Sequence, residues 1–269
     1  MNILVTVDRN YLSQLNIMLS SLVHCNPQSF FSVYLLHSSL NVTDVAETEK
    51  VLGNHGRLIP IQVTDDGLDN APITDRYPKE IYYRIFAAKY LPKDIDRILY
   101  LDPDIVINGS LELLYRLPLD RYYYAAASHN SKWFDKFNAA RLDIKNEGYY
   151  INSGVLMINL KALREEQDYD RVFRFIEDKK KLLMLPDQDV ISGLYGDKVY
   201  PINPLLYNMT ETLYKKNTIS EKRISLEWVR ENSRIIHYCG RNKPWNHKYI
   251  GKLDVFYKEA VQRMHEMVS

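Results

Sequence analysis

Short apolar runs alternate with helical patterns through the first 107 residues of the chain. Strands are predicted where β-branched and aliphatic residues are continuous, and helices where apolar residues recur every three to four positions. The predicted strands are 3–7, 31–36, 58–63 and 97–101, and the predicted helices are 12–23, 44–52 and 80–90. This alternation is typical of βαβ units with a mostly parallel sheet. We therefore predict an α/β fold.

The second half of the chain has a less regular pattern. Further strands are predicted at 122–127, 154–160 and 235–238, and helices at 169–180 and 187–194. The tail, 249–268, has apolar residues at helical spacing with basic residues around them, which predicts one long amphipathic helix. No repeat or linker separates independent domains. We predict one domain over 1–248 with the amphipathic helix of 249–269 packed on it; a helix lying in a membrane plane is the alternative for this tail.

The composition is that of an ordinary globular protein. Of 269 residues, 46% are hydrophobic and 26% are charged, and 35 Lys and Arg against 34 Asp and Glu leave a net charge of +1. Without a strong positive field, we expect no nucleic-acid partner. Cys25 and Cys239 fit neither a disulfide framework nor a zinc site, and the apolar start at 3–7 is far too short for a secretory signal. We expect a cytoplasmic protein with reduced thiols.

Two carboxylates follow the strongly apolar strand predicted at 97–101. Asp102 and Asp104 flank Pro103. Ligands of open α/β sheets bind beyond the carboxyl ends of the strands, and side chains at i and i+2 leave a strand on one side, so this pair can hold one cation. A solvated Asp-Pro-Asp turn is the alternative, and it is favoured for an isolated motif of this length.

Three further polar motifs stand at the ends of predicted elements. His237 lies in the last predicted strand, and Gly240 and Lys243 follow it, so an imidazole ligand and a counter-charge for phosphate come close together in the chain. One imidazole with two carboxylates suits Mn²⁺ somewhat better than Mg²⁺. The other two motifs are Asn152-Ser153-Gly154 and Asp187-Gln188-Asp189. Taken singly, a strand-entry turn and a helix cap would explain these two.

Together and in this order, the motifs resemble glycosyltransferase family 8, the metal-dependent retaining transferases of the GT-A fold. The resemblance covers residues 1 to 250 and includes the opening Val5-Thr6-Val7-Asp8-Arg9-Asn10-Tyr11. It implies a Rossmann-like mixed sheet flanked by helices, with a less regular C-terminal acceptor region. The implied reaction moves a hexose from UDP-glucose or UDP-galactose to a saccharide or lipid-linked acceptor, as in the biosynthesis of lipopolysaccharide or other cell-surface glycans.

The resemblance also implies roles for individual residues. Asp102, Asp104 and His237 would ligate Mn²⁺, with Mg²⁺ as the alternative. The residues implied in donor binding are Thr6, Asp8, Asn10, Tyr11, Arg84, Asp102, Pro103, His129, Asn152, Asp187, Gly240 and Lys243. The implied catalytic residues are Gln188, Asp187 and Arg84, with Gln188 near the anomeric carbon on the face opposite the leaving UDP. Because the Gln188 amide is neutral and a poor nucleophile, we favour same-face attack by the acceptor over a covalent intermediate.

One position departs from the galactosyltransferases of this family. They carry a carboxylate 25 residues after the second Asp of the metal motif, where this chain has His129. A neutral imidazole can donate or accept a hydrogen bond, whereas a carboxylate only accepts. We therefore rank UDP-glucose slightly above UDP-galactose as donor, with a solvent-facing His129 as the alternative.

Two other functions stay open on the sequence. A non-catalytic UDP-sugar binder would carry the same motifs. A phosphatase of the haloacid-dehalogenase type would use Asp102 as nucleophile, but its motif normally follows the first strand, and 101 residues precede Asp102 here. The acceptor is expected to contact 130–150 and 201–217, and the basic tail offers a peripheral contact with the inner face of the membrane.

Overall fold

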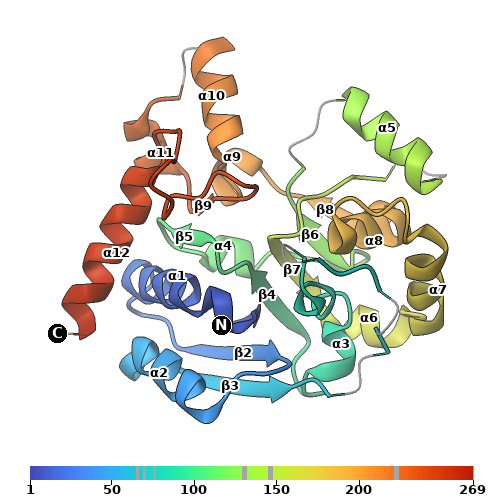
Figure 1. The fold of residues 1–269 in the computed structure, drawn as a ribbon, viewed down its shortest axis with the longest axis horizontal. Coiled ribbons are helices and arrows are strands. Elements are labelled where there is room, and N and C mark those ends of the chain that lie inside the picture. The colour runs from blue at the N-terminus through green and yellow to red at the C-terminus, as the bar shows by residue number, and fades with distance from the viewer. Residues whose placement is uncertain are drawn as a thin grey trace.

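A mixed seven-stranded sheet runs through the centre of the computed structural model (Figure 1), which describes residues 1–64, 67–68, 71–74, 77–128, 132–144, 148–220 and 224–268. Its strands, in spatial order, are β3 (Gly56–Gln62), β2 (Phe31–His37), β1 (Asn2–Thr6), β4 (Arg97–Leu101), β7 (Val155–Asn159), β6 (Tyr124–Ala126) and β8 (Val199–Pro201). Strands β3, β2, β1 and β4 are parallel, whereas β7 is antiparallel to both β4 and β6. The predicted α/β class with a mixed sheet is confirmed.

The order of the strands creates a crevice at one edge of this sheet. From β1 the chain moves outward to β2 and β3, and then returns to place β4 on the other side of β1. The carboxyl ends of β1 and β4 are therefore neighbours, and the connections that leave them diverge. Open α/β sheets bind ligands at such a switch point.

Helices cover both faces of the sheet because the side chains of its strands alternate between two apolar cores. Ile3 and Val5 of β1 pack in one core with residues of α1 (Leu12–Cys25), whereas Leu4 packs in the other core with Tyr82 and Phe86. Parallel strands that are buried on both faces read as continuous apolar runs, which explains why the sequence pattern identified them. The remaining helices of eight or more residues are α2 (Val42–Leu52), α5 (Lys132–Leu142), α7 (Tyr169–Lys179), α8 (Pro186–Tyr195), α10 (Glu211–Ser220) and α12 (Asp254–Val268).

A two-stranded sheet lies beside the main one and carries part of the site. Strand β5 (Ile105–Ile107) pairs antiparallel with β9 (Ile235–His237), with Ile105 opposite His237. The short helices α4 (Glu112–Tyr115), α6 (Leu160–Glu166), α9 (Pro204–Tyr207) and α11 (Leu226–Asn232) complete the second half. Three-residue strands and helices of four to seven residues leave little periodicity in a sequence, and β5, β8 and these helices were not predicted.

The predicted helix over 80–90 is wrong. The segment forms a 3-10 helix η3 (Lys79–Tyr82), irregular turns and a single α-turn, α3 (Ala87–Tyr90). Its amides bond three residues back, as from Ile85 to Tyr82 at 2.9 Å and from Phe86 to Tyr83 at 3.1 Å. Tyr82, Tyr83, Ile85 and Phe86 are all fully buried. Because these side chains are buried, their packing against neighbouring residues determines the backbone course of the segment. This packing favours turns over a regular helix.

The tail helix is shorter than predicted, because α12 begins at Asp254 rather than at 249. Before it, Glu211 accepts backbone hydrogen bonds from Lys252 and Leu253 at 3.1 Å, which holds the chain in a non-helical entry. The helix lies along α1 at one edge of the molecule (Figure 1), with Phe256 and Ala260 buried. Among the residues that the structure describes, no helix is long and apolar enough to cross a membrane.

Candidate active site

A cavity of about 540 Å³ opens at the switch point between β1 and β4. Most of the residues implied in donor binding, catalysis or metal binding line it: Thr6, Asp8, Tyr11, Arg84, Asp102, Pro103, Asp104, Asn152, Asp187, Gln188, His237, Gly240 and Lys243. Asn10 does not line the cavity; its side chain donates to Asp8 Oδ2 at 3.1 Å and is exposed. His129 lies outside the described residues.

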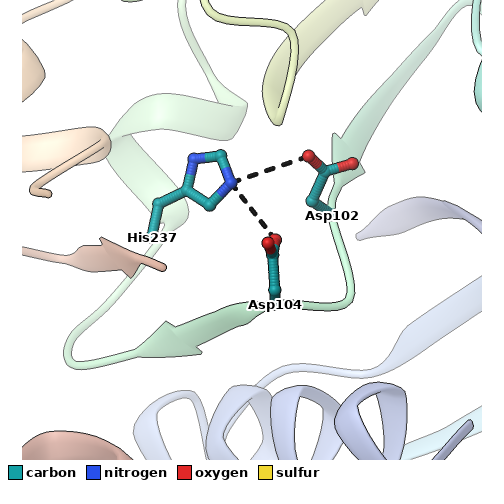
Figure 2. A group of neighbouring side chains, drawn as sticks. All are labelled: Asp102, Asp104 and His237. Atoms are coloured by element: carbon teal, nitrogen blue, oxygen red, sulfur yellow. Dashed lines mark ion pairs between the residues drawn. The ribbon is translucent and has the colours of Figure 1, made fainter. Parts of the chain in front are cut away.

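Two carboxylates and one imidazole that line this cavity point toward one another (Figure 2). Asp102 follows β4, Asp104 precedes β5, and His237 ends β9. The pairing of Ile105 with His237 brings the imidazole to the carboxylates, with Nε2 at 3.2 Å from Asp104 Oδ1 and 3.6 Å from Asp102 Oδ2. One ligand atom from each residue lies within 4.8 Å of the others. Such a set of oxygen and nitrogen donors fits a divalent cation such as Mn²⁺.

Gly154 leaves room for this cluster. A Cβ atom at Gly154 would lie 2.3 Å from Cε1 of His237 and 2.6 Å from Oδ2 of Asp102. The backbone carbonyl of the same residue accepts a 2.8 Å hydrogen bond from the amide of Asp102. The glycine of the Asn152-Ser153-Gly154 motif is therefore explained by the close approach of the candidate metal ligands, not by a turn that needs positive φ.

Lys243 brings a positive charge to the same side of the cavity. Its Nζ forms an ion pair with Asp104 and donates to the carbonyl of Tyr238 at 2.9 Å. Burial alone would raise the pKa of Asp104, but its close contacts with His237 and Lys243 outweigh burial and hold that pKa well below its usual range. Burial would lower the pKa of Lys243, and Asp104 raises it instead. Both side chains are therefore charged at neutral pH.

Arg84 joins the two acidic motifs of the sequence. Its Nη1 lies 2.9 Å from Asp102 Oδ1, 3.0 Å from Asp187 Oδ2 and 3.1 Å from the carbonyl of Ser153. The guanidinium also lies 4.2 Å from the centroid of the Tyr100 ring. Burial disfavours the charged form, but the neighbouring carboxylates raise the pKa of Arg84 above its ordinary value. Through these two carboxylates, the guanidinium links the C-terminal end of β4 to the N-terminal end of α8.

Asp187 and Gln188 lie in the first turn of α8, and both are buried against the cavity. Burial raises the pKa of Asp187, and the charge of Arg84 opposes this rise. Asp189 has another role: it is fully buried, does not line the cavity, and receives both terminal nitrogens of Arg141 at 2.7 and 2.9 Å. Its Oδ2 also accepts from the amides of Met184 and Leu185. Asp189 therefore anchors the start of α8, as the helix-cap alternative predicted.

Tyr100 and Asn208 contact the candidate metal ligands and were not predicted from the sequence. The hydroxyl of Tyr100 donates to Asp102 Oδ1 at 2.6 Å and lies 3.2 Å from Thr6 Oγ1. Its position near the end of β4, two residues before Asp102, was the available signal, because alternate residues of an extended chain share a face. Asn208, which is fully buried, lies 2.9 Å from His237 Nδ1. It comes from a short helix, and nothing local in the sequence marks this contact.

The whole-chain comparison agrees with this geometry. Residues 2–249 match the family model described as "Glycosyl transferase family 8". This chain is a member of that family. The predicted hexosyltransferase class is confirmed with it, because relatives of this family 8 enzyme include a glucosyltransferase and a galactosyltransferase.

Two bacterial relatives illustrate the likeness. The family 8 enzyme is 26% identical to a lipopolysaccharide 1,2-glucosyltransferase of Escherichia coli, over 97% of this chain and 78% of that one. It is 25% identical to a lipopolysaccharide 1,3-galactosyltransferase of Salmonella typhimurium, over 91% and 73%. The crystal structure of the galactosyltransferase LgtC with donor and acceptor sugar analogs superposes with a TM-score of 0.84 at 23% identity, over 100% of this chain and 97% of that one. That likeness confirms the predicted GT-A fold.

Proposed function

We propose that this family 8 enzyme transfers a hexose from a UDP-sugar to a saccharide or lipid-linked acceptor, with retention of configuration and with Mn²⁺ as cofactor. One observation carries the proposal: Asp102, Asp104, His237 and Lys243 converge in the cavity that Asp187 and Gln188 also line. A bound divalent cation would supply charge neutralisation for the phosphates of the leaving UDP.

Individual side chains on the cavity wall are proposed to bind the donor and to stabilise the charge that develops on it. Lys243 presents its ammonium to the diphosphate, where it stabilises the negative charge that grows as the sugar–phosphate bond breaks. Arg84 is aimed at the same region and is held there by Asp102 and Asp187. Tyr11 offers an aromatic surface to the uracil ring, and Asn152 and Asp187 offer hydrogen bonds to sugar hydroxyls. Each role rests on the resemblance together with the position of the residue on the cavity wall.

The surroundings of Asp187 favour same-face attack by the acceptor. A covalent intermediate needs a carboxylate free to attack the anomeric carbon. Asp187 is paired with Arg84 at 3.0 Å and Gln188 is a neutral amide, so neither is an effective nucleophile. We propose that the bond from the anomeric carbon to the UDP phosphate oxygen breaks, that the acceptor oxygen bonds to the same face of this carbon, and that an oxygen of the leaving phosphate accepts the proton of the acceptor hydroxyl.

The donor is proposed to be UDP-glucose ahead of UDP-galactose, on the identity of His129. These hexoses differ in the direction of one hydroxyl, and an unpaired buried polar group discriminates by about 1–3 kcal/mol. The ratio of kcat/KM for the two donors should therefore change by more than fivefold in His129→Asp, in favour of UDP-galactose. A ratio that stays within twofold of wild type would remove His129 from donor recognition.

The reaction itself is tested by UDP release. The protein is incubated with a panel of UDP-sugars and Mn²⁺ without acceptor, and slow hydrolysis of one UDP-hexose is expected because water can replace the acceptor. Chelation of the metal should abolish the release. A non-catalytic binder would instead show a donor-induced rise in melting temperature without any released UDP. The phosphatase alternative is set aside, since the chain belongs to family 8.

The place of reaction is proposed to be the cytoplasm, at the inner face of the membrane if the acceptor is lipid-linked. Two free cysteines, Cys25 and Cys239, support a reducing compartment. Sedimentation of the full chain with anionic liposomes, with and without salt, tests the membrane contact.

A further inference from the structure

Asn208 connects the candidate metal site to a residue implied in sugar binding. It follows the short helix α9, and its side chain is completely buried. Its Oδ1 lies 2.9 Å from His237 Nδ1, and its Nδ2 donates to Asn152 Oδ1 at 2.9 Å. One amide therefore contacts both a candidate metal ligand and a side chain that the resemblance assigns to the donor sugar.

The backbone N–H of Gly154 fixes the direction of the hydrogen bonds that link Asn152, Asn208 and His237. Asn152 Oδ1 accepts from the N–H of Gly154 at 3.2 Å, and a backbone N–H can only donate. The atom of Asn152 at this position is therefore its carbonyl oxygen, and Asn208 must offer its NH₂ group to the same oxygen. The carbonyl oxygen of Asn208 then faces His237, whose Nδ1 must carry a proton to donate to it.

With the proton of the imidazole on Nδ1, His237 Nε2 is unprotonated and its lone pair points toward Asp102 and Asp104. A metal-ligating imidazole needs that lone pair, and the hydrogen bond at its other nitrogen decides which tautomer is present. If the Asn208 amide were reversed, its NH₂ group would face Nδ1 and place the proton on Nε2, where it would exclude a cation. The contacts from Gly154 through Asn152 and Asn208 thus specify the ligand form of His237.

We infer that Asn208 is a positioning residue that fixes the tautomer of His237 for metal binding and couples the orientation of Asn152 to that site. The inference rests on the proposed function, because it takes Asp102, Asp104 and His237 as metal ligands. It makes a prediction that simple burial does not: an acceptor at position 208 is required for tight binding of the cation, whereas the bulk of the side chain is not.

The test is the affinity for Mn²⁺ in the presence of saturating UDP, followed by the electron paramagnetic resonance signal of free Mn²⁺. Asn208→Ala is expected to weaken Mn²⁺ binding by about 10- to 100-fold, the usual effect of removing the partner of a ligating imidazole. Asn208→Asp keeps an acceptor for Nδ1–H but loses the donor to Asn152 Oδ1, so it should bind Mn²⁺ more tightly than Asn208→Ala and less tightly than wild type.

Two further variants separate positioning from stability. Ser233→Ala is the matched control, because Ser233 is fully buried and donates to the carbonyl of Leu205 in the same α9 segment at 2.6 Å without contact to the site. It should lower the melting temperature and leave Mn²⁺ affinity unchanged. Asn152→Ala removes the group that orients Asn208 and should weaken Mn²⁺ binding, with a non-additive effect in the double variant with Asn208→Ala.

The outcomes distinguish this inference from the proposed function. If wild-type protein with UDP binds no Mn²⁺, the proposed metal-dependent function fails. If wild type binds and Asn208→Ala binds within twofold of it, the function stands and the positioning role is overturned. An equal loss of affinity in Ser233→Ala would also overturn it, because the effect would then follow stability alone.

Discussion

Asp187 and Asp189 stand two residues apart on α8, and their surroundings differ in a way that separates binding from structure. Asp189 is fully buried, and its two oxygens accept from both terminal nitrogens of Arg141, the hydroxyl of Tyr150 and two backbone amides. No acceptor capacity is left for a ligand. Asp187 lines the cavity and shares a single guanidinium nitrogen with Asp102.

The same contrast extends to the candidate metal cluster. Asp102 and Asp104 lie against the same imidazole nitrogen, at 3.6 and 3.2 Å, and Asp104 Oδ1 has no hydrogen-bond partner among the described residues. Like charges held this close gain most when a cation joins them. Asp189, whose oxygens have a full set of donors, is an anchor, whereas Asp102 and Asp104 keep acceptor capacity beside a cavity and form a candidate binding site.

The largest expected effect is the loss of the Asp189 anchor. Asp189→Asn leaves the guanidinium of Arg141 buried without its counter-charge, and breaking a buried pair in this way costs about 3–5 kcal/mol. Urea denaturation should show this loss in the free energy of unfolding. The double variant with Arg141→Met removes the unpaired charge and should recover part of it; a single variant as stable as wild type would contradict the anchoring role.

In contrast to Asp189→Asn, Asp104→Asn should lower activity more than stability. We expect kcat/KM for the UDP-hexose to fall about 10²- to 10³-fold, the usual cost of removing one group that stabilises transition-state charge. The variant should lose less unfolding free energy than Asp189→Asn, because Lys243 lines a cavity and keeps the carbonyl of Tyr238 as a partner.

Ligand-linked stability gives the matching thermodynamic measurement. In wild type, Mn²⁺ with UDP at 100 times the dissociation constant should add about 2.7 kcal/mol to the free energy of unfolding. Asp104→Asn should lose the part of this gain that depends on Mn²⁺. The same gain from UDP in the presence of EDTA would argue against a metal bridge between protein and nucleotide.

A smaller effect is expected at the glycine that makes room for the cluster. The methyl group of Gly154→Ala would overlap His237 and Asp102, so overpacking should cost about 1–3 kcal/mol of stability and weaken Mn²⁺ binding. Gly53→Ala is the control: its Cβ would meet nothing within 4 Å, but its φ of +50° strains any side chain, and Gly53 does not line the cavity. It should lower stability without the selective loss of Mn²⁺ affinity, and equal Mn²⁺ losses in the two variants would refute the steric explanation.

The smallest expected effect lies on the surface, at the pair of Arg230 with Glu259. The two groups are joined by hydrogen bonds of 2.7 and 2.8 Å, but both are partly exposed, and such pairs contribute about 0.2–1 kcal/mol. The hydrogen bond from Arg230 lowers the pKa of Glu259. Its stabilisation is therefore present above the ordinary glutamate pKa and is lost as pH falls through the lowered one. Denaturation of Arg230→Ala and wild type at pH 7 and pH 3 should give a larger difference in the free energy of unfolding at pH 7 than at pH 3.

The pattern of apolar and polar residues along the chain by itself determined the parallel part of the sheet and the position of the candidate active site. Strands β1 to β4 and helices α1 and α2 follow from apolar runs and helical spacing, which are local properties of the sequence. The position of Asp102 and Asp104 at a strand end is local as well, and the resemblance named most of the residues that line the cavity.

Only the tertiary structure decided which of the polar residues share a site. Asp187 and Asp189 belong to one motif, but their partners differ. Asp187 pairs with Arg84, 103 positions before it, whereas Asp189 pairs with Arg141 of α5. The contact of Asn208 with His237 depends on where α9, which is too short to leave a periodic signal, packs against the predicted strand β9. The irregular course of 80–90 has the same origin, since its shape follows from burial on all sides. Spacing along the chain reports on neighbours along the chain, whereas the partner of a buried charge is chosen by packing between distant segments.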